Sequence, residues 1–376
     1  MHPDNLLIIA DSDHDADILY AVGMFVPDPF IYLSLGGKGH VVIGDLEIDR
    51  AKKEVPHCRV LALSRYVKLL RSKNGKNPTL PEIAAQILRE RRFRKISVPP
   101  SFPLGYAREL RDCGIKVKVT DGGCFPEREI KTADEVKKLS AALMMAEVGM
   151  AEGIHALKAS KIGKGRQLFY RNLPLTSEKL RSIIDVAIIQ VGGFASHTIV
   201  AGGNQGCDPH ERGHGPLRAH EPIVLDIFPR SQKTGYFGDI TRTVVKGRPS
   251  EAVRRLYHTV AEGQDLGITQ VRAGAKGRDV HQAVLDLFVK RGYKTGKRRG
   301  HMEGFFHGTG HGLGLQIHEA PRVGPASPDT LRAGHVVTVE PGLYYPGTGG
   351  VRLEDVVLVT AKGCLNLTKF EKVLEI

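Results

Sequence analysis

The feature that most restricts how this chain can fold is the placement of single carboxylates within apolar, strand-like segments. Asp226 lies in the middle of Ile223–Phe228, and Asp239 follows after a polar turn, in Gly235–Thr243. Two strands joined by a turn form a hairpin, which can bring the two aspartates together. A carboxylate within an apolar strand is costly unless a positive charge compensates it. Taken alone, the pair favours a buried salt bridge to an arginine over a metal site.

A second segment, Phe306–Glu319, combines histidine and glycine at unusual density. His307, His311 and His318 fall within twelve residues, and five glycines lie between positions 304 and 314. Glycine lets the backbone approach another group closely and adopt positive φ. A single histidine packed in a core would not need so many glycines, so this segment favours a functional site.

Two further acids, Glu340 and Glu354, repeat the first arrangement. Each lies beside an apolar β-type run, and a turn containing proline and glycine joins the two runs. With Asp226, Asp239 and His311 they make four carboxylates and one imidazole, a ligand set for two divalent cations that bridging carboxylates would hold about 3.5–4 Å apart. Such oxygen-rich ligation favours Mn²⁺, Co²⁺ or Fe²⁺, with Mn²⁺ the first expectation, and is also compatible with Zn²⁺.

The chemistry expected of such a pair of cations is hydrolysis. Two cations that share one water lower its pKa towards neutrality, produce a hydroxide nucleophile and polarise the carbonyl that it attacks. A serine or cysteine nucleophile is then unnecessary, and the sequence contains no G-x-S-x-G motif.

The length of 376 residues exceeds one typical core, so two domains are expected. In the first, apolar runs such as Leu6–Ala10 and Phe30–Leu35 alternate with helical patterns, one of which begins with a capping box at Thr79. This order predicts an α/β domain with a mainly parallel sheet over residues 1–125. Residues 126–376 open with a long helix and then become rich in glycine and β-type runs, which predicts an α+β domain with a mostly antiparallel sheet.

The chain carries an excess of positive charge, with 54 Lys and Arg against 41 Asp and Glu, or +13. Such an excess is compatible with nucleic-acid binding. The densest basic clusters, Arg89–Lys95 and Lys294–Arg299, are short and separate and lack the repeated aromatic residues of a base-stacking surface, so nucleic acid is not the expected partner. For the second cluster two interpretations stay open: a solvated turn, or attraction of the carboxyl terminus of a substrate.

A cytoplasmic location without a membrane partner is expected. No segment approaches the ~18 uninterrupted apolar residues of a membrane helix. The N-terminus has neither a basic region nor an apolar signal core. The five cysteines are scattered, without a disulfide framework or a CxxC pair, which suits a reducing compartment.

The motifs closely resemble those of the pita-bread metallopeptidases, which include methionine aminopeptidase, Xaa-Pro aminopeptidase and prolidase. The resemblance runs from about Ile199 to Glu371 and rests on four stretches that occur in the family's order: VLDIF…GYFGDITRT, FFHGTGHGLGLQIHEAPRV, LRAGHVVTVEPGLYY and GGVRLEDVVLVT. It is strongest with the proline-directed branch. It implies a pita-bread domain with a curved, mainly antiparallel sheet over residues 126–376, preceded by a creatinase/prolidase-like α/β domain.

The resemblance also implies a role for each position of the ligand set. Asp226 is expected to bind one metal ion, and Asp239 and Glu354 are expected to bridge both ions. His311 and Glu340 are expected to bind the second ion. Glu340 is also the residue that the resemblance implies as general base for the bridging water.

Around these ligands the resemblance implies residues that contact the substrate or support a ligand. His318 matches the position that contacts the substrate carbonyl or the tetrahedral intermediate. His307 matches a histidine that lines the proline pocket in the proline-directed branch. Arg352 matches an arginine that organises the carboxylate two residues further on, Glu354.

An upstream histidine and a threonine complete the expected site. His210, preceded by proline, matches a proline–histidine pair of the family. His214 and His220 lie nearby and are alternatives, with His210 the preferred candidate. Thr241 matches a residue that supports the bridging Asp239.

The activity that the resemblance implies is hydrolysis of the peptide bond before proline, by an Xaa-Pro dipeptidase or an Xaa-Pro aminopeptidase. Proline-containing dipeptides or peptides would be the substrates, and the family suggests a homodimer. Two other classes are a creatinase-like amidinohydrolase and a non-catalytic relative that binds peptides or nucleic acid. Both kinds of relative lose metal ligands, whereas all five positions are filled here. The choice between dipeptidase and aminopeptidase depends on the entrance to the pocket and stays open.

Overall fold

The computed structural model describes residues 5–298 and 300–376. The chain divides into two compact units, Met1–Arg128 and Glu129–Ile376, and the boundary predicted between residues 125 and 126 lies close to this division. Residues 1–4, part of the N-terminus considered above, and Arg299 of the second basic cluster lie outside the described residues.

In the described part of the first unit, a six-stranded sheet has the order β4-β3-β2-β1-β5-β6. The strands are β1 (Asn5–Ala10), β2 (Phe30–Leu35), β3 (Lys38–Ile43), β4 (Arg59–Ala62), β5 (Lys95–Val98) and β6 (Lys116–Val119). Three of the five neighbouring pairs are parallel, whereas β2 runs antiparallel to β1 and β3. The sheet is therefore mixed, because Gly36 and Gly37, both at positive φ, join β2 and β3 as a hairpin.

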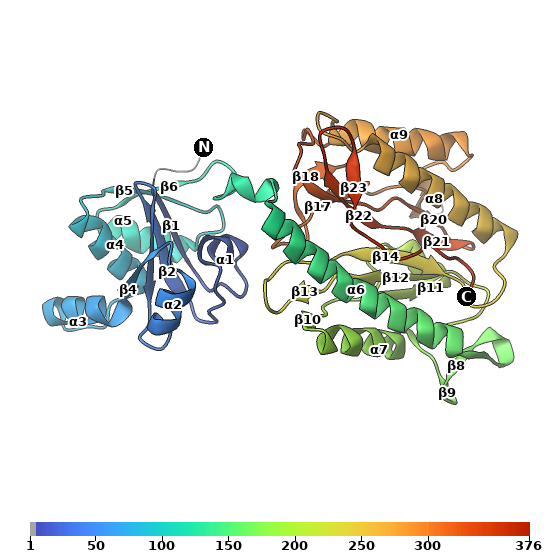
Figure 1. Ribbon diagram of the computed structural model, residues 1–376, viewed down its shortest axis with the longest axis horizontal. Helices are drawn as coiled ribbons and strands as arrows, with labels where there is room; N and C mark the ends of the chain where they lie inside the picture. Colours follow the sequence, from blue (N-terminus) through green and yellow to red (C-terminus); the bar gives the residue numbers. More distant parts are fainter. Residues whose placement is uncertain (1–4, 299) are drawn as a thin grey trace. The chain divides into compact units, whose positions relative to one another are not determined.

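Helices cover both faces of this sheet (Figure 1). They are α1 (Ala16–Val22), α2 (Ile48–Glu54), α3 (Leu63–Asn74), α4 (Leu80–Glu90) and α5 (Leu104–Asp112). The alternation of side chains along β1 sends Leu7 and Ile9 to one face, and Leu6 and Ile8 to the other. The first pair packs with apolar residues of α3, α4 and α5, and the second with apolar residues of α1 and α2. Both faces of the sheet are thereby buried.

Capping boxes begin a helix in each unit. The Thr79 hydroxyl accepts a hydrogen bond from the Glu82 amide, and the Glu82 carboxylate accepts one from the Thr79 amide. Helix α4 starts at Leu80, the residue after Thr79. Thr132 and Glu135 form the same reciprocal pair at the start of α6 (Ala133–Ala159), the long helix of the second unit. Helices α1, α2 and α3 were not predicted from the sequence. Helix α3 follows β4 without an intervening residue, so no turn announces it.

Two antiparallel sheets, each covered by a pair of helices, build the centre of the second unit (Figure 1). Helices α6 and α7 (Ser177–Gln190) lie against the first sheet, and α8 (Glu251–Gln270) and α9 (Gly277–Lys290) against the second. The first sheet contains β11 (Ile199–Gly202), β12 (Ile223–Ile227) and β14 (Ile240–Val244). The second contains β17 (Gly310–Gly312), β18 (Glu319–Val323), β19 (Val336–Val339), β22 (Asp355–Val359) and β23 (Cys364–Asn366). All pairings between these strands are antiparallel, as predicted.

Shorter elements connect these layers. The 3₁₀ helices are η1 (Pro126–Glu129), η2 (Lys164–Arg166) and η3 (Gly203–Cys207). The short strands are β7 (Lys161–Ile162), β8 (Leu168–Tyr170), β9 (Leu173–Pro174), β10 (Gly193–Phe194), β13 (Arg230–Ser231), β15 (Gly296–Arg298), β16 (His301–Glu303), β20 (Gly342–Tyr345) and β21 (Gly349–Arg352). Within the described residues, no helix has both the length and the apolar character needed to cross a membrane.

Candidate metal centre

The antiparallel pair β12 and β14 brings the two aspartates together. Asp226 lies within β12 opposite Thr241, and Ile227 lies opposite Ile240. Asp239 directly precedes β14, so it follows the same hairpin around to the position beside the end of β12. The predicted hairpin is therefore present, although Asp239 lies at the start of its strand rather than within it.

The glycines around His311 allow neighbouring strands to approach it closely. A Cβ atom added to Gly310 would lie 2.0 Å from the Thr338 carbonyl oxygen, and one added to Gly312 would lie 2.2 Å from the Ala320 carbonyl oxygen. Any larger residue would therefore push the strands on either side of β17 apart. The glycine density of this segment follows from the close packing that carries the imidazole into the site.

Glu340 and Glu354 meet because their strands pair in antiparallel register. Glu340 directly follows β19, and Glu354 directly precedes β22. In that register Val339 lies opposite Asp355, so the two acids flank the same end of the strand pair. The β-type runs that the sequence predicted here thus place both carboxylates at one edge of the second sheet.

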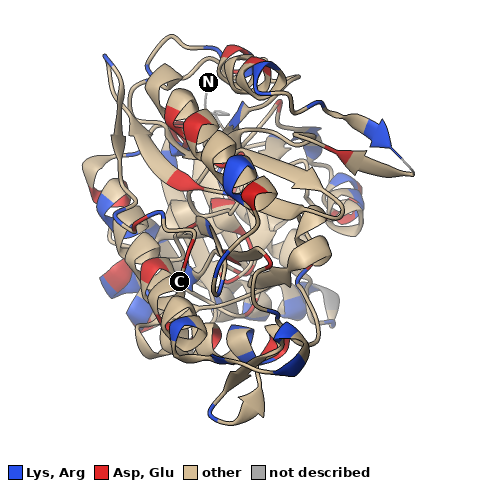
Figure 2. Ribbon diagram, turned by 90° about the vertical axis from the view of Figure 1, so that its right-hand side faces the viewer, with Lys and Arg blue, Asp and Glu red and all other residues tan. Residues whose placement is uncertain are grey.

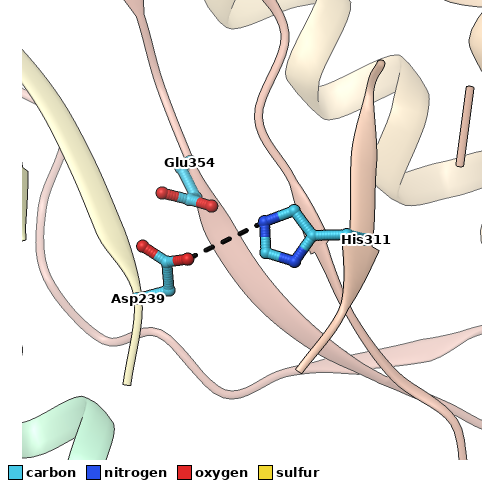
Figure 3. Close-up of side chains that lie close together, drawn as sticks. All are labelled: Asp239, His311 and Glu354. Atoms are coloured by element: carbon cyan, nitrogen blue, oxygen red, sulfur yellow. Dashed lines mark ion pairs between the residues drawn. The ribbon is translucent and has the colours of Figure 1, made fainter. Parts of the chain in front are cut away.

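The five predicted ligands converge on one cavity of about 640 Å³. Asp239, His311 and Glu354 are buried, and each offers a donor atom within 4.8 Å of the donor atoms of the other two (Figure 3). The His311 Nε2 atom lies 3.8 Å from Asp239 Oδ2 and 3.3 Å from Glu340 Oε1. Asp226 lines the same cavity. Side chains that are up to 128 positions apart (354 − 226) therefore face one another.

The electrostatics of this cluster are those of a cation site. Burial, and then repulsion by the neighbouring carboxylates, raises the pKa of Asp239 and of Glu354 well above the ordinary range. Burial raises the pKa of Glu340 to about 7 and lowers that of His311 to about 3, which leaves its imidazole neutral. Among the described residues Asp239 Oδ1 has no hydrogen-bond partner, although it is buried. Buried carboxylates and a neutral imidazole are suitable ligands for a divalent cation.

Two supporting residues contact a different carboxylate from the one predicted. Arg352 was expected to organise Glu354, but its Nη2 atom forms an ion pair with Asp226 Oδ2 at 2.8 Å. The reason is that β21, which carries Arg352, packs beside β12. Thr241 was expected to support Asp239, but its hydroxyl donates to Glu354 Oε2 at 2.9 Å. The Glu354 amide also donates to the Thr241 carbonyl, so these two backbones lie side by side.

Tyr344, which the sequence analysis did not single out, links the predicted His307 to the cluster. The His307 Nδ1 atom lies 2.7 Å from the Gly308 carbonyl oxygen and therefore carries the proton, so Nε2 accepts from the Tyr344 hydroxyl at 2.8 Å. The Tyr344 oxygen in turn accepts from Arg352 Nη1 at 3.0 Å. Burial, together with the Arg352 charge, lowers the pKa of His307 to about 3. The sequence signal available was only a tyrosine in an apolar strand.

The other predicted histidines differ in their access to the cavity. His318 and His210 are both exposed and both line it. The His318 ring lies against the His311 ring, with centroids 4.4 Å apart. Of the alternatives, His214 is not among the described residues that line the cavity, and its side chain is 72% exposed. The geometry thus favours His210 over His214.

Comparison of the sequence with known proteins gives a consistent set of relatives. The sequence pattern of Metallopeptidase family M24 matches residues 137–361. An Xaa-Pro dipeptidase of Pyrococcus horikoshii is 30% identical over 292 residues, which cover 75% of each chain. An uncharacterized peptidase of Staphylococcus aureus strain MRSA252 is 32% identical over 248 residues, which cover 65% of this chain and 64% of that relative.

Solved structures with similar folds cover almost the whole chain. An X-Pro aminopeptidase from Thermotoga maritima MSB8 matches with a TM-score of 0.83 at 22% identity, covering 99% of this chain and 97% of that one. A dipeptidase from Pyrococcus horikoshii OT3 matches with a TM-score of 0.79 at 27% identity, covering 99% and 95%. The predicted fold class, an α/β unit followed by an α+β pita-bread unit with mainly antiparallel sheets, is confirmed.

Proposed function

The chain belongs to metallopeptidase family M24, and from this premise we propose that it hydrolyses the peptide bond before proline with the help of two divalent metal ions. The observation that carries the proposal is the convergence of four carboxylates and one imidazole on a single cavity. The proline preference is inferred from the names of the relatives, which are an Xaa-Pro dipeptidase, an X-Pro aminopeptidase and a prolidase from Pyrococcus furiosus.

The proposed ligands divide between the two ions as the family resemblance implies. Asp226 would bind one ion, His311 and Glu340 the other, and Asp239 and Glu354 both. The fit of these residues to cations rests on the neutral imidazole and on the buried Asp239 oxygen that has no hydrogen-bond partner among the described residues. When bound, the ions would polarise the scissile carbonyl and activate a water molecule. Mn²⁺ is the favoured metal because oxygen donors predominate, with Co²⁺, Fe²⁺ and Zn²⁺ as alternatives.

The protein's own groups would then handle the protons and hold the substrate. The Glu340 carboxylate would accept the proton of the attacking water as general base. His318, at the exposed side of the cavity, would donate to the substrate carbonyl oxygen as negative charge develops there. Arg352 would hold Asp226 in place through their ion pair.

Three aromatic or imidazole groups define where the proline would lie. His307 is fixed by its hydrogen bonds to the Gly308 carbonyl and the Tyr344 hydroxyl. Phe306, the residue before His307, also lines the cavity, and the centroid of its ring lies 5.3 Å from the centroid of the Tyr344 ring. We place the proline ring against this wall, because a rigid apolar surface suits an apolar ring that cannot donate a hydrogen bond. His210 would line the same cavity from the upstream segment.

A homodimer in the cytoplasm is proposed on separate grounds. The homodimer comes from the family resemblance, and sedimentation of the purified protein would test it. The cytoplasmic location rests on the five cysteines, which are all free in the structure.

A metal-reconstituted assay tests the activity directly. We expect cleavage of Ala-Pro or of a longer Ala-Pro peptide, and no comparable reaction with a Met-peptide or with creatine. Activity should disappear on chelation and return with Mn²⁺. Preferential cleavage of the Met-peptide, or turnover of creatine, would contradict the proposed specificity.

A further inference from the structure

A second cavity borders the catalytic one. It has a volume of about 480 Å³ and shares three lining residues with the catalytic cavity, namely Asp208, Pro209 and Phe306. Phe306 belongs to the wall on which the proline of a substrate is placed above. Residues on the carboxyl side of that proline would therefore pass from the catalytic cavity into this second one.

The lining of the second cavity suits the side chain of a peptide residue. Cys207, Met302, Phe306 and Pro346 give it an apolar wall. The polar groups of the lining are Asn204, Asp208 and His301. Met302 and His301 come from β16, and Met302 is 44% exposed. A flexible thioether on an open wall can adapt to side chains of different shape.

A third cavity, of about 720 Å³, shares Pro346 with the second and is strongly basic. Its charged lining residues are Arg255, Lys294, Lys297 and Arg298, against a single acid, Glu303. None of these four basic side chains forms an ion pair with another residue in the described part of the chain. Their charges are therefore available to an anionic ligand.

The hairpin of β15 and β16 contributes lining residues to the second and third cavities, which are called the outer cavities below. Its strands pair antiparallel from Gly296 opposite Glu303, and Figure 2 shows it projecting at the upper right with its first strand in blue. Gly304, which directly follows β16, forms two hydrogen bonds with Tyr344 of the candidate site. The amide of each residue donates to the carbonyl oxygen of the other. Tyr344 also holds His307, so the hairpin and the proline wall are parts of one hydrogen-bonded structure.

We propose that this hairpin binds the carboxyl-terminal part of peptides longer than a dipeptide, with a preference for acidic ones. The residue after proline would occupy the second cavity, and the terminal carboxylate or acidic side chains beyond it would lie in the basic third cavity. This inference rests on the proposed function and names its substrate class: the protein acts as an aminopeptidase on extended Xaa-Pro peptides. A dipeptide ends at its proline and would leave both outer cavities empty.

The test compares three substrates on the Mn²⁺-loaded full-length protein: Ala-Pro, Ala-Pro-Ala-Ala and Ala-Pro-Asp-Asp. The wild type should have its highest kcat/KM on the acidic peptide, and the advantage should shrink as ionic strength rises. In a variant with Lys297→Glu and Arg298→Glu, kcat/KM for the acidic peptide should fall about tenfold, mainly through KM, with Ala-Pro kinetics unchanged. The matched control is Lys68→Glu with Arg71→Glu, an equal charge change on exposed residues of α3.

The outcomes separate this inference from the proposed function. If no Xaa-Pro substrate is cleaved, the proposed function fails and the inference falls with it. If the peptides are cleaved but the hairpin variant treats all three as the wild type does, the function stands and the inference is overturned. It is also overturned if a single-stranded oligonucleotide binds the wild type and not the variant while the peptide kinetics stay equal, because the basic cavity would then be a nucleic-acid site.

Discussion

The segment that carries Glu354 and Asp355 shows two ways in which this protein buries an acid. The two residues are neighbours in sequence, and both are almost completely buried. Asp355 Oδ1 forms an ion pair with Arg242 Nη2 at 2.9 Å, and Asp355 Oδ2 lies 3.1 Å from Lys372 Nζ. Glu354 faces the other way, towards Asp239 and Glu340, and its hydrogen bond comes from the Thr241 hydroxyl. The surroundings of Asp355, called the neutralised side below, contain basic partners. The surroundings of Glu354, called the ligand side, contain other acids.

The difference shows what separates a structural acid from a candidate ligand. From sequence alone, both are carboxylates beside apolar residues, and a salt bridge to arginine explains either one. That explanation holds for Asp355, and it holds in part for Asp226, which pairs with Arg352. It does not extend to Asp239, for which the described residues supply three acidic neighbours and a neutral imidazole. A buried acid becomes a candidate ligand where its neighbours are also acids.

The largest effect should come from removing an acid on the ligand side. In Asp239→Ala, kcat should fall by roughly 10³-fold or more, because several kcal/mol of charge stabilisation depend on the ions. Metal analysis of the purified variant should show that the ions are lost with the activity. Asp286→Ala, an exposed acid on α9, is the matched control and should keep both. A variant at Asp239 that stayed fully metal-loaded would refute its bridging role.

A smaller effect, on stability rather than activity, should follow from breaking the neutralised side. Arg242→Leu should lower the free energy of unfolding by about 3 kcal/mol, because it removes the buried cation that pairs with Asp355 and leaves only the partly exposed Lys372 and the neutral Asn366 amide as described partners of its carboxylate. Urea denaturation measures this. The comparison is sharpened by Asp239→Asn in metal-free protein, which should not destabilise, because burial and the neighbouring acids already disfavour the charged form of Asp239. An equal decrease in the free energy of unfolding for Arg242→Leu and Asp239→Asn would contradict the distinction between the two sides.

The smallest of these effects concerns a histidine at the edge of the cluster. His318→Ala should keep the metal content and lower kcat by about 10²-fold, because a group that stabilises the developing charge is removed while the ligands stay. His214→Ala removes an exposed histidine that lies outside the cavity lining and should behave like the wild type. Loss of the metals in the His318 variant would show that this residue belongs to the ligand set.

Elements with a local signal could be predicted from the sequence, and elements without one could not. The capping boxes at Thr79 and Thr132 fix their helices through contacts three residues apart, which a sequence displays directly. Helix α3 has no side-chain cap and no preceding turn, so nothing local distinguishes it from a continuation of β4. The glycine pair Gly36 and Gly37 is itself a local signal for a hairpin turn, but the surrounding order of elements, typical of parallel sheets, predicted a mainly parallel sheet rather than an antiparallel β2.

The candidate site divides in the same way. The membership of the five side chains could be anticipated, because acids in apolar strands and a histidine among glycines are visible in sequence; their roles as ligands stay predictions. The carboxylates predicted to contact Arg352 and Thr241 differ from those observed. The contact that each side chain makes depends on the strand that packs beside it, which the sequence does not display. Tyr344 was missed for a similar reason, since its hydroxyl gains its role only from His307 and Arg352.

The most direct test of the central claim is the number of metal ions bound per chain. Protein saturated with Mn²⁺ and freed of excess metal should contain two ions per chain by elemental analysis, and Glu354→Ala should contain fewer. Two ions in the wild type and their loss in the variant would support the five side chains as one dinuclear site. A wild type that binds no divalent ion under these conditions, or a variant that keeps both, would contradict it.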